Sequence, residues 1–197
     1  EPGLRWTNLM EGHELYTAGH MIEAAVAYYE ATGKKKFLDI VSRFADLICE
    51  HLRSRGGQDS RLSGHQEIEL ALVKLYRVTG TRKYLELAKY FIDARGEGEN
   101  YFLNEEKKPA FKRIFPDFHD YNPAYSQSHQ PVRKQKTAEG HAVRANYMYS
   151  AMADLACEYE DDRLKAACEN LWDNMVHKRM YITGSVGSSG ILERFTT

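Results

Sequence analysis

The feature that most constrains this sequence is an internal repeat. Residues 31–38 (ATGKKKFL) and 78–85 (VTGTRKYL) align with an offset of 47 positions, and in each copy a glycine separates two stretches with apolar residues at helical spacing. A more divergent third copy covers about 140–177, with the charged segment 160–164 in place of the glycine turn. A unit of two helices joined by a tight turn, repeated three times, predicts three helical hairpins that stack on one another.

The repeat predicts an all-α chain. The odd-numbered helices of stacked hairpins run parallel, and such a stack forms either an open solenoid or a closed ring. Because closure of a ring needs more than three hairpins, we expect this chain to form part of a ring. The expected helices cover about 19–31, 36–52, 64–80 and 82–96, followed by two within 140–177.

A long insertion separates the second and third copies. It runs from about 97 to 135 and holds four of the five prolines. A loop of this length inside a compact helical domain is usually functional or flexible. Its aromatic content favours a packed loop over a disordered linker. The aromatic residues are Tyr101, Phe102, Phe111, Phe115, Phe118, Tyr121 and Tyr125.

Composition excludes several classes of function. Lysine and arginine number 27 against 28 aspartates and glutamates, so a net charge of −1 argues against nucleic-acid binding. No stretch approaches the ~20 apolar residues of a membrane-spanning helix.

The three cysteines lie too far apart for the pattern of a zinc site or a disulfide framework; they are Cys49, Cys157 and Cys168. We therefore expect buried thiols, a reducing cytoplasmic compartment and no metal ligand within the chain. The start at Glu1 lacks the pattern of a secretory signal, and we expect the native N-terminus to be missing.

Three Gly-His pairs, at 12–13, 64–65 and 140–141, stand at or near the start of helical stretches. In a ring of hairpins the N-termini of the inner helices share one rim, where free N–H groups and the helix dipole favour polar ligands. His13, His65 and His141 are therefore candidate binding residues. His20 is a competing candidate for the first position, because the repeat aligns Gly19-His20 with Gly64-His65, and spacing alone leaves that choice open.

Two further segments carry candidate site residues. The small-residue loop at 181–190 leads to Glu193, whose carboxyl group could act as a general acid or base; the loop lacks the strand, lysine and spacing of a phosphate-binding loop. In the segment 125–133, Gln127 and His129 could donate hydrogen bonds to sugar hydroxyls beside an aromatic ring. The same side chains could equally satisfy the backbone of their own loop.

Four segments together resemble glycoside hydrolase family 127, the β-L-arabinofuranosidase family and its relatives. They occur in the family's order with similar spacing, which makes the resemblance specific. The segments are HELYTAGHMIEAAVAYYEATG, GHQEIELALVKLYRVTG, KTAEGHAVRANYMYSAMADLA and NMVHKRMYITGSVGSSGILERF.

The resemblance implies an (α/α)6 toroid and retaining hydrolysis of a terminal β-L-arabinofuranoside by a zinc-bound cysteine nucleophile. It implies that Glu193 is the acid/base and that His13, His65 and His141 contact the sugar, which favours His13 over His20. The family's nucleophile and zinc ligands lie beyond the position of Thr197, so zinc is expected only in the full-length enzyme.

We therefore expect residues 1–197 to be a middle part of a catalytic toroid domain, inactive alone, with apolar edges that self-associate or bind the missing segments. A carbohydrate is the expected substrate. Two alternatives stay open: a related toroid glycosidase with a different sugar preference, and a non-catalytic helical-repeat module that binds carbohydrate or a protein partner.

Overall fold

The structure is a computed structural model that describes residues 2–52, 61–115, 121–190 and 192–196. Helices make up most of these ranges, which contain no β-strand and one isolated bridge, between His141 and Arg194. The prediction of an all-α chain is confirmed. The α-helices are α1 (Glu14–Thr32), α2 (Lys36–Leu52), α3 (Ile68–Thr79), α4 (Arg82–Ala94), α5 (Tyr101–Glu105), α6 (Ala142–Glu158) and α7 (Asp162–Asn174). Short 3-10 turns cover Pro2–Leu4, Pro123–Ser126 and Val132–Lys134, and a π-helical turn covers Met175–Arg179.

The first two hairpins have the same turn. Gly33 and Gly80 both adopt the left-handed conformation, with φ of 69° and 70°. The N–H of each donates to a tyrosine carbonyl four residues earlier, Tyr29 and Tyr76 respectively, at 2.7 Å. This closes each helix with a left-handed C-cap. The repeat at an offset of 47 is therefore a repeat in structure.

The third hairpin reaches the same shape by another route. Glu160 takes the left-handed conformation (φ 51°) where the other copies have glycine. Asp161 caps α7 by accepting the Leu164 N–H at 2.9 Å, and its other carboxylate oxygen pairs with Arg133 at 2.6 Å. In the segment 160–164, which stands in place of the glycine turn, a side-chain cap and an ion pair take over its role.

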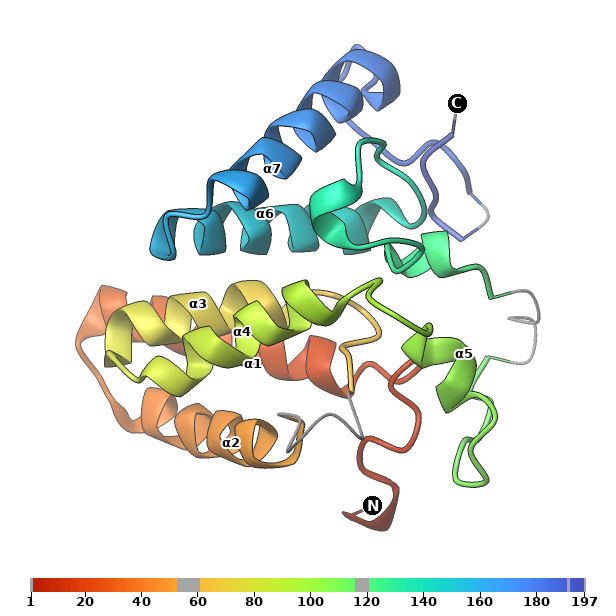
Figure 1. Cartoon of the computed structure of the whole chain (residues 1–197). Coiled ribbons are helices and arrows are strands. Elements are labelled where there is room, and N and C mark those ends of the chain that lie inside the picture. The colour runs from red at the N-terminus through yellow and green to blue at the C-terminus, as the bar shows by residue number, and fades with distance from the viewer. Residues whose placement is uncertain (1, 53–60, 116–120, 191, 197) are drawn as a thin grey trace.

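The hairpins stack in chain order, with α2 at one end of the stack and α7 at the other (Figure 1). Helix α3 lies in the middle and packs against α1, α4 and α6. A helix enclosed on several sides must be apolar over most of its surface. Five of its apolar side chains are fully buried: Ile68, Ala71, Leu72, Val73 and Leu75.

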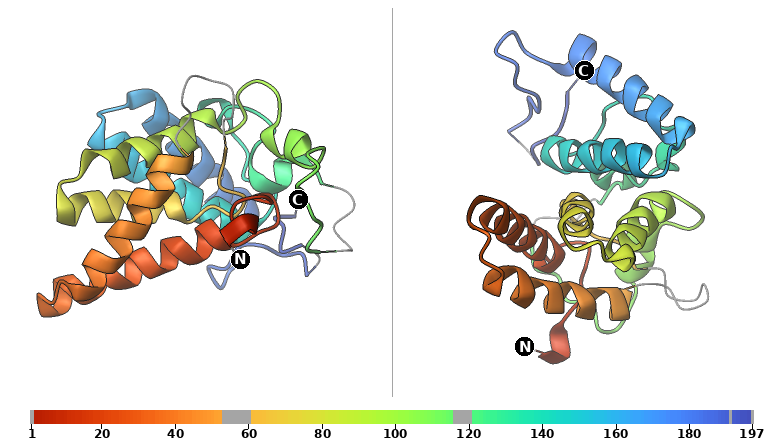
Figure 2. Two further views of the ribbon diagram at one scale, coloured as in Figure 1. Left: turned by 90° about the horizontal axis from the view of Figure 1, so that it is seen from below. Right: turned by 90° about the vertical axis from the view of Figure 1, so that its left-hand side faces the viewer.

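The view along the helices shows α1, α3 and α6 as successive neighbours (Figure 2). These are the first helices of the three hairpins, and their N-terminal ends face the side where the insertion and the C-terminal loop gather (Figure 1). The helix expected to open at Gly64 begins at Ile68, so the residues just before it belong to a bent, non-helical connection. This parallel arrangement brings the three Gly-His pairs to one rim.

The insertion is packed against the helical stack. Phe102 and Val132 are buried, and Tyr125 is 7 % exposed. The buried carboxylate of Glu105 accepts the backbone N–H groups of Leu9 and Met10 at 2.9 and 2.7 Å, which fixes the segment before α1 to the insertion. Phe118, one of the aromatic residues that favoured a packed loop, lies outside the described residues. Among the described helices, none is long and apolar enough to cross a membrane.

Candidate active site

Three imidazoles meet at the rim. The ring centroid of His65 lies 5.5 Å from that of His13 and 5.3 Å from that of His141. His13 and His141 directly precede α1 and α6, and His65 lies three residues before α3. Tyr16, one turn into α1, places its ring 4.3 Å from that of His65. The sequence prediction that His13, His65 and His141 converge matches this placement.

The glycines of these pairs permit close backbone packing. A Cβ at Gly64 would lie 1.6 Å from the carbonyl oxygen of Leu9. A Cβ at Gly140, where φ is 76°, would lie 2.0 Å from the carbonyl oxygen of Ala124. Glycine therefore lets neighbouring segments press against the residue before each histidine, which holds the imidazole at the rim.

Hydrogen bonds set the orientation of each neutral ring. The Nδ1 atoms of His13 and His65 contact the backbone carbonyls of Glu11 (2.9 Å) and Gln66 (2.8 Å). A carbonyl only accepts, so these Nδ1 atoms carry the proton and Nε2 is left as an acceptor. At His141 the Nδ1 accepts the Arg144 backbone N–H at 3.4 Å, which leaves Nε2–H as a donor. The cluster thus offers two acceptors and one donor.

Burial keeps these rings neutral. Desolvation lowers the pKa of His65 to about 3 and that of His141 to about 4, and it also lowers the pKa of His13. The next largest cause for all three is the positive charge of Arg144. Neutral imidazoles that both donate and accept suit hydroxyl groups better than charged ones do.

Glu193 stands at the same rim. Its Oε2 lies 2.8 Å from Nε2 of His141, and its side chain is 68 % exposed. Backbone bonds fasten its loop to the start of α6: the Ala142 N–H donates to the Glu193 carbonyl, and the Phe195 N–H donates to the Gly140 carbonyl, each at 2.9 Å. Glu193 takes a left-handed conformation (φ 49°), which is uncommon outside glycine and clusters at functional sites.

These groups surround a cavity of about 630 Å³. That volume falls within the usual range of small-molecule sites, and the mixture of imidazoles, two carboxylates, an arginine and apolar surface suits a polar ligand with an apolar face. The lining residues are Met10, Glu11, His13, Tyr16, His65, Phe115, Tyr125, His141, Val143, Arg144, Leu192 and Glu193.

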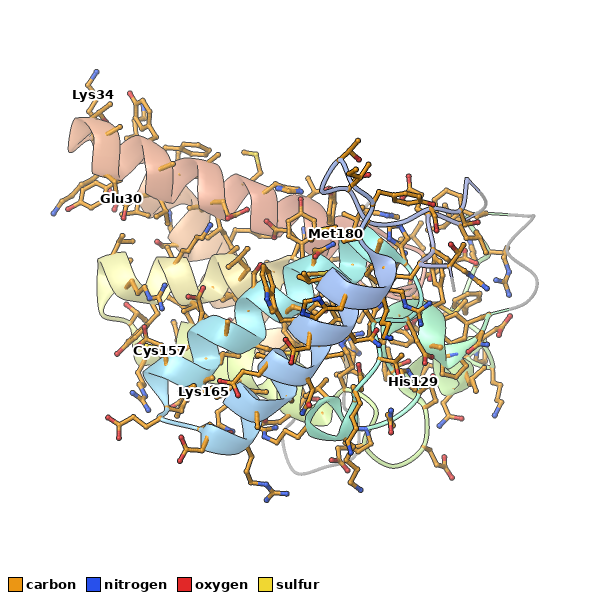
Figure 3. The ribbon with its side chains drawn as sticks, turned by 90° about the horizontal axis from the view of Figure 1, so that it is seen from above. Glu30, Lys34, His129, Cys157, Lys165 and Met180 are labelled. Atoms are coloured by element: carbon orange, nitrogen blue, oxygen red, sulfur yellow. The ribbon has the colours of Figure 1, made fainter. Side chains whose placement is uncertain are left out.

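Two residues expected at the sugar lie elsewhere. Gln127 is 1 % exposed, and its amide is used internally: Oε1 accepts from Gln66 at 2.8 Å and Nε2 donates to the Glu139 carbonyl at 2.8 Å. His129 is exposed on the insertion, with a ring nitrogen 3.3 Å from Gln130 (Figure 3). Of the two functions left open for this loop, the geometry matches satisfaction of its own backbone.

His20 also lies off the cavity lining. Its ring packs edge-on against Tyr16, 4.4 Å between centroids, and its Nδ1 lies 3.3 Å from Oε1 of Glu67. His20, Glu23 and Glu67 are the group of possible metal ligands found among the described residues, with their ligand atoms all within 4.8 Å of one another. Lys74 pairs with Glu23 and already supplies positive charge there, and burial raises the pKa of Glu67. We therefore assign these residues no metal.

The zinc that the family resemblance implies does not fit the thiols of this chain. Cys49 is buried and its Sγ contacts the Lys83 carbonyl at 3.9 Å, while Cys157 is exposed at the far end of α6 from the cavity (Figure 3). Burial raises the pKa of Cys168 to about 11, which disfavours a thiolate. No cysteine lines the cavity in the described chain.

Sequence reasoning missed Tyr16, Phe115 and Arg144. Tyr16 and Arg144 each lie three residues after a cavity histidine, on the same face of α1 and α6, so helical spacing could have found them. Phe115 comes from the insertion, where its ring lies 6.1 Å from that of His13. Only the folded chain brings it there, because 102 residues separate the two positions.

Comparison with known proteins identifies the family. The family description "Beta-L-arabinofuranosidase, GH127 catalytic domain" matches residues 1–197. The non-reducing end beta-L-arabinofuranosidase of Bifidobacterium longum subsp. longum is 40 % identical over 192 residues, covering 98 % of this chain and 29 % of that protein.

Two solved structures are also similar. A GH127 beta-L-arabinofuranosidase from Geobacillus stearothermophilus T6 is 54 % identical with a TM-score of 0.92, covering 99 % of this chain and 30 % of that one. A GH127 beta-arabinofuranosidase is 43 % identical with a TM-score of 0.82, covering 98 % of this chain and 27 % of that one. The chain therefore spans about three tenths of the length of these relatives. It belongs to glycoside hydrolase family 127, and its helical hairpins form part of the family's (α/α)6 toroid.

Proposed function

We propose that the protein carrying this chain is a retaining glycoside hydrolase that releases terminal β-L-arabinofuranose from glycans, and that residues 1–197 are part of its single catalytic toroid domain. The observation that carries the proposal is the placement of Glu193, 2.8 Å from His141 at a rim shared with His13 and His65. Two relatives, 40 % and 54 % identical to this chain, are beta-L-arabinofuranosidases, which supports the choice of sugar.

In this proposal Glu193 is the acid/base. Its carboxyl group donates a proton to the glycosidic oxygen as the bond to the leaving group breaks, and then, as a carboxylate, takes a proton from the water that attacks in the second step. Its exposure supports this role, because the leaving group and water must both reach it. The left-handed backbone at Glu193 and the bonds to Ala142 and Gly140 hold the carboxyl at the rim.

The three histidines bind the sugar. The Nε2 atoms of His13 and His65 accept hydrogen bonds from sugar hydroxyls, and the Nε2–H of His141 is shared between a hydroxyl and Glu193. The Phe115 ring offers an apolar surface at the opposite end of this row of rings, next to His13. Carbohydrate C–H faces pack well on such aromatic surfaces.

The nucleophile is a separate part of the proposal. On the family resemblance it is a zinc-bound cysteine, contributed by a region outside these 197 residues, where zinc would hold the thiol in its thiolate form. Because the cysteines of this chain do not fit that role, no step described for Glu193 or the histidines depends on the metal.

The test uses the protein that carries this chain, with zinc supplied, and an aryl β-L-arabinofuranoside as substrate. Glu193→Gln should lower kcat by about 10²–10⁴-fold, because amide cannot donate or accept the proton. For the first step, the loss in rate should be smaller with an aryl group that leaves more readily, because its departure depends less on protonation. Glu30→Gln, an exposed glutamate at the far end of α1 (Figure 3), is the matched control and should keep full activity.

Three outcomes would contradict the proposal in whole or in part. Full activity in Glu193→Gln would remove Glu193 from the acid/base role. If the unsubstituted protein releases no arabinose but releases a different sugar from other aryl glycosides, the sugar is wrong and the glycosidase activity stands. No release from any glycoside would favour a binding module.

A further inference from the structure

Arg144 connects three parts of the cavity wall. It lies in the first turn of α6, and its side chain is buried, with 5 % of the residue exposed. Its Nη1 donates to the carbonyl of Gly64, the residue before His65, at 2.6 Å. Its guanidinium stacks over the ring of Tyr125, 4.8 Å from the centroid. One side chain therefore fixes the His65 segment, the His141 helix and the aromatic wall relative to one another.

Among the described residues, no carboxylate forms an ion pair with Arg144. The other buried arginine of this part of the chain, Arg95, pairs with Glu69 at 3.4 Å. A buried cation without a counter-charge is costly to the folded state. Its presence beside the cavity calls for a role other than stability.

The field of this charge reaches all three imidazoles. Arg144 contributes to the lowered pKa of His13, His65 and His141, second only to burial in each case. The other titratable or charged groups facing the imidazoles and the guanidinium from the surrounding elements are Glu11, Tyr16, Arg95, Tyr121, Tyr125, Tyr147, Glu193 and Arg194.

We propose that Arg144 is a positioning residue of this site: its bond to Gly64 and its stacking on Tyr125 fix His65, His141 and the aromatic wall relative to one another. Its charge adds to burial in opposing protonation of the three imidazoles. The inference rests on the proposed function, since it assigns the imidazoles to sugar hydroxyls. Arg144 lines the cavity beside these rings and acts on the reaction through them.

The neutral state of His141 matters for Glu193. As the structure stands, a neutral Nε2–H faces the Glu193 carboxyl at 2.8 Å. Protonation of His141 would convert this hydrogen bond into an ion pair and replace the neutral donor at the carboxyl group. The charge of Arg144, with burial, opposes that protonation of His141.

The experiment compares Arg144→Met and Arg144→Gln, which remove the charge, with Arg144→Lys, which keeps it but loses the planar fork. The histidines are labelled with ¹⁵N, and their ring signals are assigned with His13→Gln, His65→Gln and His141→Gln. NMR titration from pH 3 to 8 then reports protonation and tautomer without any need for activity. In parallel, kcat and KM are measured against pH.

In the unsubstituted protein we expect all three imidazoles to be neutral at pH 6, with the proton on Nδ1 of His13 and His65 and on Nε2 of His141. In the uncharged variants their titration midpoints should rise by about one pH unit or more, and the acidic limb of the kcat/KM profile should move to higher pH by the same amount. Arg144→Lys should keep the low midpoints while raising KM.

Three results would overturn the inference. The inference fails if the three imidazoles titrate near pH 6.5 in the unsubstituted protein, whatever the variants show. Unchanged midpoints in a folded uncharged variant would exclude the electrostatic role. If both uncharged variants unfold, a rise of the histidine titration midpoints in Arg144→Lys would also exclude the electrostatic role, because lysine keeps the charge. Inactivity of the protein on arabinofuranosides would contradict the proposed function but leave the imidazole titrations to decide the role of Arg144.

Discussion

Among the described residues two arginines are buried, and their surroundings differ. The two terminal nitrogens of Arg95 pair with an anion and with backbone acceptors: the Glu69 carboxylate at 3.4 Å, the Ser63 carbonyl at 2.7 Å and the Ser126 carbonyl at 3.0 Å. Arg144 has the Gly64 carbonyl and an aromatic face, and beyond it lies the cavity.

The difference distinguishes two uses of buried polarity. Around Arg95 the polar groups meet one another, so the network holds the insertion on the helical stack and specifies its position. Around Arg144 positive charge and neutral imidazoles face a cavity that a ligand can fill. Buried polar groups that bond to one another indicate a structural role. Buried polar groups that face a cavity indicate a ligand-binding role.

The largest effect expected from this comparison is on stability. Arg95→Met should lower the free energy of unfolding by about 3–5 kcal/mol, because it leaves the buried Glu69 carboxylate without its partner. Arg144→Met should cost less than about 2 kcal/mol, because it removes one hydrogen bond together with an unpaired buried charge. Urea unfolding of both variants measures the difference, and equal losses would show that the two regions are alike.

A second prediction concerns the network at Gln127. Gln127→Ala should lower the free energy of unfolding by about 1–3 kcal/mol, because Gln66 and the Glu139 carbonyl lose their buried partner. The KM of the folded protein should stay unchanged. His129→Ala, on the exposed part of the same loop, should alter neither quantity. A large rise in KM without a loss of stability would instead place Gln127 at the sugar.

The third prediction uses pH. The folded pKa values of His65 (about 3) and His141 (about 4) lie below the ordinary value of about 6.5, so below that pH the unfolded chain binds protons that the folded chain refuses. Their contribution to stability is complete above pH 6.5 and is lost as pH falls toward 3–4, at about 1.4 kcal/mol per pH unit for each histidine.

The measurement is urea unfolding at pH 7, 6 and 5 for the unsubstituted protein and His65→Gln. The difference in slope between the two isolates the histidine, because buried acids such as Glu67 and Glu105, whose pKa values are raised, shift stability in the opposite direction in both proteins. Equal slopes would show that His65 protonates freely in the folded state and that the imidazole cluster is more open to water than the structure indicates.

Much of the helical architecture could be predicted, because its signals are local. The glycine turns at Gly33 and Gly80 and the cap at Asp161 lie within a few residues of the helices they end or begin. The predicted span 36–52 matches α2, whereas the expected start at Gly64 was four residues early. There the Leu9 backbone packs closely against Gly64, and residues 64–66 are bent instead of helical.

The candidate site could be predicted only in part. The convergence of His13, His65 and His141 follows from the repeat, since equivalent positions in parallel helices share one rim. The internal placement of Gln127 does not follow, because its partners Gln66 and Glu139 come from the segment before α3 and from the residues between the insertion and α6. No local pattern tells a glutamine that binds a sugar from one that binds a backbone.

The sequence by itself determined the hairpins, the side of the stack that carries the histidines and the family, because repeats and motifs are properties of short segments. Only the tertiary structure decided which polar groups are closed off and which face the cavity. Burial, the lack of an ion pair at Arg144 among the described residues and the 2.8 Å contact between His141 and Glu193 all depend on segments far apart in the chain. Desolvation and charge interactions act through space, and the distances that govern them exist only once the chain has folded.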